Sequence, residues 1–396
     1  MKKMKTNNGL TGAITESAGW TAFLTFLFFL LKWNDNPAPD MLLALPFFVI
    51  LYFLFFSIGK EQVVGRMKAW INSDVKKSVI FPVVLLVLYF GYVLINGQNP
   101  FKGTLALLPY LIFFPVLVFS AQRKNAGKIG WLDFATFVIF LLPTTLVDFS
   151  PKGNLPFNGS GFDSVFRIVI MLIAVYAFGT LRGLEEIGFY PSLSWSHFKY
   201  SILSWLAFYS LVMVIGYSVG FIQIVGHDSV NRELVTKIVL ALVVTFLHTA
   251  MFEEIFFRGI LQNMLAKRIG QSGNWTAFWY GGVAILIPLA LLVGYTLKGG
   301  MQWFPALITA LLFAAARSVE KMKISQAGVY TSLAITSVVF GLVHYHSGSI
   351  VYIGFACMAG WAYGYTYIKT RNVFYCALVH TLVNVSALMF GLELMK

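Results

Sequence analysis

Long apolar segments recur along almost the whole length of this 396-residue chain. A helix that crosses a bilayer needs about 20 mostly apolar residues, because its backbone polar groups must be satisfied within the helix. About thirteen segments approach that length, and the first and the tenth are short enough to be interfacial or re-entrant. The segments are 20–31, 41–58, 79–95, 105–119, 131–147, 165–180, 201–220, 235–265, 276–297, 303–316, 327–345, 350–368 and 373–392. This pattern predicts an all-α fold, a polytopic transmembrane helical bundle with about 11–13 spans.

The charge content agrees with a membrane protein. Hydrophobic residues make up 58% of the chain and charged residues 11%, whereas soluble domains carry about 25% charged residues. So few charges cannot cover a water-exposed body of this length, so we expect the lipid bilayer to be the main surrounding. The net charge of +13 lies in short loops between apolar segments, which excludes a basic domain that binds nucleic acid.

The basic residues predict the orientation in the membrane. Lys2, Lys3 and Lys5 precede the first segment. Strict alternation of spans places the remaining basic loops on the same side; these hold Arg66, Lys68, Lys76, Lys77, Arg123, Lys124, Lys128, Arg182, Lys267, Arg268, Arg317, Lys321, Lys323, Lys369 and Arg371. Because cytoplasmic loops are rich in Lys and Arg, we expect a multi-pass protein of the cell membrane with a cytoplasmic N-terminus.

Ionisable residues inside apolar segments are costly and point to function. The segment 235–265 contains Glu253, Glu254 and Arg258. Glu254 and Arg258 are four residues apart, so they share a helical face and can pair. Glu253 points about 100° away and has no partner at helical spacing. We therefore predict that Glu254 is structural and that Glu253 is a general base.

Two later apolar segments each present a pair of side chains on one helical face. Phe340 and His344 are four residues apart, and so are His380 and Asn384. A Glu–His pair can hold and deprotonate a water, while a His–Asn pair can stabilise the oxyanion formed when water attacks a peptide carbonyl. These groups suffice for a hydrolase that has no nucleophilic Ser or Cys.

Each motif alone has an ordinary structural explanation. A single Glu–Arg pair in a membrane helix commonly pins helices together, and a single His commonly makes a helix–helix hydrogen bond; we interpret His248 and His346 in that way. Glu185 and Glu186 form a second acidic pair, but it has no Arg four residues later and lies in a polar loop. We predict that this second pair is solvated.

The ordered motifs resemble the CAAX protease and bacteriocin-processing family, also called the Abi family, which includes the type II CAAX prenyl endopeptidases. The family pattern is EExxxR, then FxxxH, then HxxxN. The matching residues are Glu253, Glu254, Arg258, Phe340, His344, His380 and Asn384.

The resemblance implies an intramembrane endopeptidase that acts on a peptide or a membrane-protein segment. Glu253 and His344 would activate the water, and His380 and Asn384 would form the oxyanion hole. Glu254, Arg258 and Phe340 would orient the site. The resemblance implies no cofactor, with zinc as an alternative in which one Glu and two His are the ligands.

The resemblance covers about the last 165 residues and divides the chain. We expect N-terminal transmembrane helices of unassigned role over 1–198 and a catalytic membrane core over 199–396. About 80 residues separate the first two motifs, more than is typical of the family, so we expect an inserted helical pair at about 271–325.

Two other functions fit a chain of this composition. A non-catalytic membrane scaffold or regulator, of the bacteriocin-immunity or signalling type, would retain the fold, but it has no need of the complete motif set. A transporter would fit the number of segments, but the chain shows no matching broken helices in two halves. The endopeptidase is the leading hypothesis.

Overall fold

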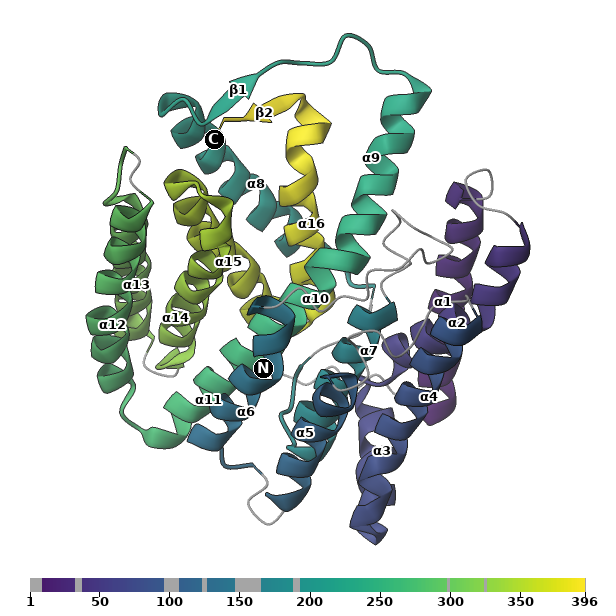
Figure 1. Ribbon diagram of the computed structural model, residues 1–396. Helices are drawn as coiled ribbons and strands as arrows, with labels where there is room; N and C mark the ends of the chain where they lie inside the picture. Colours follow the sequence, from purple (N-terminus) through teal and green to yellow (C-terminus); the bar gives the residue numbers. More distant parts are fainter. Residues whose placement is uncertain are drawn as a thin grey trace. The chain divides into compact units, whose positions relative to one another are not determined.

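The computed structural model describes residues 9–32, 38–95, 107–122, 127–146, 165–187, 193–297, 300–323 and 326–395 (Figure 1). Lys2, Lys3, Lys5, Arg123 and Lys124, which contributed to the predicted orientation, lie outside these ranges. The chain forms two compact units, Met1–Pro191 and Ser192–Lys396. The described part of the chain is helical apart from turns and two three-residue strands, which confirms the predicted all-α fold class.

Unit 1 consists of short and medium helices. They are α1 (Leu10–Lys32), α2 (Ala38–Ser57), α3 (Glu61–Ser73), the 3₁₀ helix η1 (Val75–Val79), α4 (Ile80–Ile95), α5 (Leu107–Ala121), α6 (Trp131–Leu146), α7 (Val165–Ala174) and the π-helix η3 (Val175–Leu181). Arg182 follows η3, and its guanidinium donates hydrogen bonds to Asp133 and to the Lys128 carbonyl. Arg182 and Asp133 are both buried, so their side chains form an ion pair in the interior of the unit.

Unit 2 contains a row of long helices closed at one end by a small sheet. Its elements are α8 (Trp195–Ser218), β1 (Ile222–Ile224), α9 (Arg232–Val244), η4 (Thr245–Ala250), α10 (Met251–Glu254), η5 (Ile255–Gln262), α11 (Asn263–Ser272), α12 (Trp275–Thr296), α13 (Phe304–Met322), α14 (Val329–Leu342), η7 (Val343–Ser347), α15 (Ile350–Thr370), α16 (Val373–Phe390) and β2 (Leu392–Leu394). The strands pair antiparallel, with Ile222 opposite Leu394. The sheet therefore joins the end of α8 to the end of α16, two helices far apart in sequence (Figure 1).

The helix boundaries in unit 2 follow local capping rules. Gly273 adopts a left-handed conformation with φ of 67° and ends α11. The side chain of Asn274 then accepts a hydrogen bond from the backbone of Ala277 and begins α12. In the same way Ser349 caps α15 and Asn372 caps α16. These caps keep each turn short, so neighbouring helices in the sequence also lie side by side.

Five helices in the described residues are long and apolar enough to cross a membrane, or six if the bent pair Leu42–Ser57 and Glu61–Ser73 forms one span. This is fewer than the 11–13 spans predicted from the sequence. The helix α15 explains part of the difference, because most of its residues are buried within unit 2. A helix surrounded by other helices does not need an apolar surface toward lipid.

The region 271–325, where the sequence predicts an inserted helical pair, contains α12 and α13, with residues 298–299 and 324–325 outside the described ranges. Both helices pack against α14, and Phe304, Ile308 and Phe313 belong to the same apolar core as Phe340 and Tyr363. At the end of α13 the buried Glu320 carboxylate accepts two hydrogen bonds from Thr331 at the start of α14, each of 2.7 Å. The pair is therefore fully integrated into the packing of unit 2.

The helices α14 and α15 approach each other closely because glycine occupies two contact positions. A Cβ atom on Gly341 would lie 2.1 Å from the sulfur of Cys357, and one on Gly360 would lie 2.8 Å from the Cα atom of Ser337. Small residues allow such backbone approach between membrane helices. The close contact fixes the position of α15 relative to the motif residue Phe340 on α14.

The glutamate motif lies on an unusual helix. The elements from α9 to α11 form one continuous helix of 41 residues, Arg232–Ser272. The four α-helical residues of α10, which include Glu253 and Glu254, lie between the two π-helices η4 and η5. A π-helix has a wider turn than an α-helix and is frequently found at functional sites.

Candidate active site

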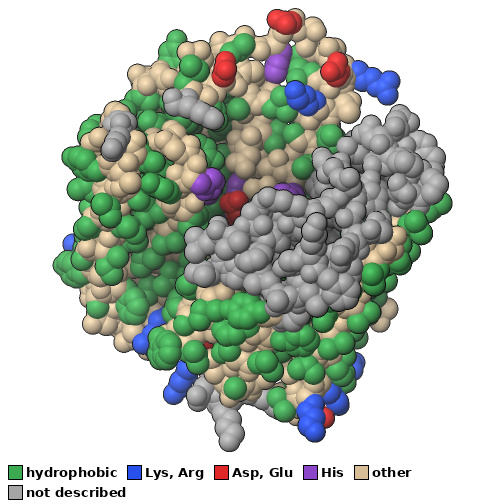
Figure 2. All heavy atoms as spheres, in the orientation of Figure 1, with side chains coloured by type: hydrophobic (Ala, Val, Ile, Leu, Met, Phe, Trp, Pro, Cys, Tyr) green, Lys and Arg blue, Asp and Glu red, His purple; other side chains and the backbone are tan. Residues whose placement is uncertain are grey.

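A single cavity in unit 2 brings the predicted catalytic residues together. It has a volume of about 440 Å³ and is lined by Glu253, His344, His380 and Asn384, together with Phe340. These residues come from α10, α14, η7 and α16. Figure 2 shows acidic and histidine side chains gathered in a hollow on the face drawn. The four residues span about 130 positions of sequence, so only the tertiary fold unites them.

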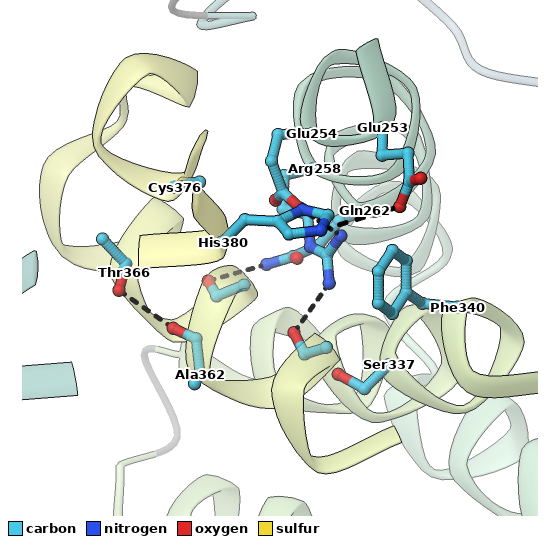
Figure 3. A network of polar contacts seen from close by, with 12 residues as sticks. Glu253, Glu254, Arg258, Gln262, Ser337, Phe340, Ala362, Thr366, Cys376 and His380 are labelled. Atoms are coloured by element: carbon cyan, nitrogen blue, oxygen red, sulfur yellow. Dashed lines mark hydrogen bonds and ion pairs between the residues drawn. The ribbon is translucent and has the colours of Figure 1, made fainter. Parts of the chain in front are cut away.

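Glu254 and Arg258 lie behind the cavity wall and form its polar support. Both side chains are fully buried, and Arg258 Nη1 donates to Glu254 Oε1 over 2.9 Å (Figure 3). Arg258 Nη2 also donates to the carbonyl of Gly360 on α15 over 3.0 Å. The predicted Glu254–Arg258 pair is therefore present, and it ties η5 to α15.

Glu254 has a second partner that helical spacing does not predict. The Nδ1 atom of His380 lies 2.8 Å from Glu254 Oε1, across 126 residues of sequence. A carboxylate paired with a permanently charged guanidinium is ionised and can only accept hydrogen bonds. His380 Nδ1 therefore carries a proton, and its other ring nitrogen, Nε2, is directed toward Glu253.

Glu253 projects into the cavity from the same helix. Its Oε2 lies 3.9 Å from His380 Nε2, too far for a direct hydrogen bond. Its side chain keeps 24% of its accessible surface, and Oε2 has no hydrogen-bond partner among the described residues. A buried carboxylate oxygen requires a donor, and a water in the cavity is a donor of the right size.

His344 lies one turn beyond Phe340, as the sequence predicts, but on a different kind of helix. The structure ends α14 at Leu342, and His344 belongs to the 3₁₀ helix η7, whereas the sequence predicted one helical segment through residue 345. His344 Nδ1 lies 2.7 Å from the carbonyl of Phe340. Since a carbonyl only accepts, Nδ1 carries the proton and Nε2 is left as an acceptor toward the cavity.

Asn384 follows His380 by one turn of α16, and both line the cavity as their spacing predicts. Among the described residues no side-chain hydrogen bond involves the Asn384 amide, which lets its two N–H groups serve a bound molecule. The cavity thus offers acceptors from Glu253 and His344 beside an amide donor.

Five other polar residues line the cavity without belonging to any motif: Tyr209, Thr249, His346, Tyr352 and Tyr363. We interpreted His346 as a structural residue, and its Nδ1 does lie 3.1 Å from the Val343 carbonyl, yet its side chain also borders the cavity. No signal in the sequence distinguishes the three tyrosines from the other aromatic residues of the chain. By contrast, Glu185 and Glu186 are exposed, as predicted for the second acidic pair.

The described residues contain no group of three or more His, Cys, Asp or Glu side chains arranged to hold a metal ion. Glu253, His344 and His380 share the cavity but do not form such a group. Both histidines use Nδ1 in hydrogen bonds with the protein, which leaves Nε2 of each for the cavity. That the site needs no metal stays a prediction, and metal analysis of the active protein tests it.

Comparison with known families agrees with the motifs. Residues 235–322 and 319–386 match the family described as type II CAAX prenyl endopeptidase Rce1-like. The match covers less than half of the chain and shows that this region is similar to that family. All seven motif residues fall within the matched ranges, and the match includes α12 and α13. The predicted resemblance is therefore confirmed for the matched region. No curated protein and no solved structure matches the chain.

Proposed function

We propose that this chain is an intramembrane endopeptidase that hydrolyses a peptide bond in a membrane-associated peptide or protein. The observation that carries the proposal is the shared cavity of Glu253, His344, His380 and Asn384 in a region that matches an endopeptidase family. Burying any one of these polar groups alone is costly, and a common reaction centre explains why all four lie together. The substrate need not carry a prenyl group.

The charges around the cavity suggest where a proton is held. Glu253 and Glu254 supply two negative charges, and Arg258 supplies one positive charge. A buried cluster with uncompensated charge is unfavourable, so one extra proton would balance it. His380 is the best position for that proton, because its two ring nitrogens face the two carboxylates at 2.8 and 3.9 Å.

This proton makes the predicted role of Glu253 as a general base compatible with the predicted role of His380 as a donor to the oxyanion. An imidazolium at His380 presents Nε2–H as a donor, while Glu253 remains an ionised acceptor. Glu253 and His344 Nε2 then hold a water between them. As the water oxygen bonds to the substrate carbonyl carbon, Glu253 takes one proton from it. The carbonyl oxygen becomes an oxyanion that His380 and the Asn384 amide stabilise.

The reaction finishes without any other reactant. The tetrahedral intermediate collapses, the carbon–nitrogen bond breaks, and the proton held by Glu253 passes to the leaving amine. The products are a carboxylic acid and an amine, and the oxygen and protons of the water are fully distributed between them. Glu254 and Arg258 take no part in these transfers and serve to keep His380 in position.

The family match and the apolar helices support a multi-pass membrane protein. We propose the cell membrane as its location and a cytoplasmic N-terminus, because the basic loops alternate with the helices. The four residues would then act at a depth where water is scarce, within a polar cavity surrounded by apolar helices.

The proposal is tested with the purified full chain in lipid nanodiscs and a library of quenched fluorescent peptides, with and without a farnesylated C-terminal cysteine. We expect cleavage by the wild type and a loss of at least about 100-fold in Glu253→Gln. Circular dichroism and gel filtration should show the same fold for both proteins. Absence of cleavage by the wild type would favour the non-catalytic scaffold, and equal cleavage by the variant would exclude Glu253 as the general base.

A further inference from the structure

Tyr363 on α15 contacts several motif residues but belongs to no motif. Its side chain is 1% exposed and also lines the cavity. Its ring lies parallel to the imidazole of His380, with centroids 4.6 Å apart and planes inclined by 13°. Phe340 meets the same imidazole edge to face at 5.8 Å and 88°. His380 is therefore held between two aromatic rings at right angles.

The stack supplies a constraint that the hydrogen bond to Glu254 lacks. The bond at Nδ1 restrains the rotation of the imidazole about Cβ–Cγ only loosely, because the angle of a hydrogen bond at a carboxylate oxygen varies broadly. A ring stacked at 13° fixes the plane, and offset parallel stacking is a favourable aromatic arrangement. Together the two contacts determine the direction of Nε2, which lies 3.9 Å from Glu253.

Tyr363 also holds the residue behind Glu254. The Arg258 guanidinium carbon lies 5.1 Å from the centre of the Tyr363 ring and 4.4 Å from that of Phe340. Both distances are in the range of cation–π contacts. The same ring thus touches His380 and Arg258, the two partners of the Glu254 carboxylate.

The backbone around Tyr363 shows that this face of α15 is built against η5. Arg258 donates to the carbonyl of Gly360, three residues before Tyr363, over 3.0 Å. Gln262 donates to the carbonyl of Gly364, the next residue, over 3.2 Å. Tyr363 lies between two hydrogen bonds that join α15 to the glutamate helix, so its ring has little freedom to move.

We propose that Tyr363 is a positioning residue, whose ring sets the plane of His380 and so aims Nε2 at the reacting atoms. Its hydroxyl is not required for this role, because both the stacked contact and the cation–π contact belong to the ring. The effect on catalysis rests on the proposed function, whereas the effect on His380 does not.

The experiment uses full-length protein labelled with ¹⁵N-histidine in nanodiscs, with His380→Gln to assign the signals of His380. The variants are Tyr363→Leu, which removes the ring, and Tyr363→Phe, which retains it. Tyr367→Leu is the matched control, because Tyr367 lies one turn further along α15 and is also 1% exposed. It removes an equal volume from a ring that lies against the Arg371 guanidinium.

We expect the Nδ1 and Nε2 signals of His380 to shift and broaden in Tyr363→Leu alone, because the ring is no longer held in one orientation. With any peptide that the wild type cleaves, kcat should fall by about 10- to 100-fold in Tyr363→Leu at nearly constant KM. Tyr363→Phe should remain within about twofold of the wild type, since the geometry of the ring is kept.

Unchanged His380 signals in folded Tyr363→Leu would overturn the proposal, and so would equal changes in Tyr367→Leu. If Tyr363→Leu does not fold, Tyr363→Met, which keeps the volume without the ring, is judged by the same measurements. Failure of both to fold, while Tyr367→Leu folds, would make Tyr363 purely structural. If the wild type cleaves no peptide, the histidine signals still decide the positioning role.

Discussion

Replacing Glu254 by Gln removes a charge on which two buried groups depend. Arg258 and His380 both bond to Glu254 Oε1, at 2.9 and 2.8 Å, and the Glu254 and Arg258 side chains are fully buried. In the variant Arg258 keeps its bond to Gly360 and its aromatic contacts, but its charge has no counterion. Breaking a buried pair by removing one partner costs about 3–5 kcal/mol.

That cost is large beside the total stability of a folded domain, about 5–15 kcal/mol. We therefore expect Glu254→Gln to give a low yield of folded protein and to unfold at lower denaturant. Glu253→Gln is the control, because the neighbouring carboxylate is 24% exposed and bonds to no described residue. Its free energy of unfolding should change by less than about 1 kcal/mol.

The measurement is reversible unfolding in mixed micelles of dodecyl maltoside and sodium dodecyl sulfate, followed by circular dichroism. The single variant Arg258→Gln and the double variant Glu254→Gln/Arg258→Gln complete a thermodynamic cycle. Because the double variant removes both buried charges, it should be more stable than Glu254→Gln alone. The reasoning would be refuted if Glu254→Gln were as stable as Glu253→Gln. It would also be refuted if the double variant lost as much free energy of unfolding as Glu254→Gln and Arg258→Gln lose together.

Three further outcomes follow from the site and its packing. Asn384→Ala should lower kcat by about 100- to 1,000-fold without changing thermal unfolding, because it removes one oxyanion donor; a tenfold or smaller effect would contradict that role. Elemental analysis of active protein should find no stoichiometric zinc, and chelators should leave activity unchanged; loss on chelation with recovery on adding zinc would replace the glutamate mechanism by a metal mechanism. Gly360→Ala should destabilise unit 2 by about 1–3 kcal/mol, because the added Cβ would lie 2.8 Å from the Ser337 Cα atom; unchanged unfolding would show that α15 can shift freely.

Features that depend on residues near one another in the chain were predictable. Apolar runs predicted the helices of unit 2, because a bilayer leaves a helix as the only way for one segment to satisfy its own backbone. The Glu254–Arg258 pair and the contact of Phe340 with His344 also follow from helical spacing. In each case the geometry lies within one or two turns, where the chain itself sets the distance.

Predictions from regular helical spacing failed where the backbone departs from the α-helix. His344 lies on a 3₁₀ turn, and the glutamates lie between two π-helical stretches. Gly259 lies inside η5 and Gly348 ends η7, but single glycines in apolar segments did not predict these changes. The segments η4, η5 and η7 pack against α14, α15 or α16, and such contacts with distant helices cannot be read from local spacing.

Contacts between distant helices were decided by the tertiary structure alone. The sequence determined which polar groups had to be hidden from lipid, and it therefore pointed to Glu253, His344, His380 and Asn384 as a set. It could not determine that His380 binds Glu254 or that Tyr363 stacks on His380. These contacts depend on how closely α14, α15 and α16 approach the glutamate helix, and glycines at the interface set that distance only once the helices have met. A hydrogen bond requires placement within a few tenths of an ångström, which only the packed bundle provides.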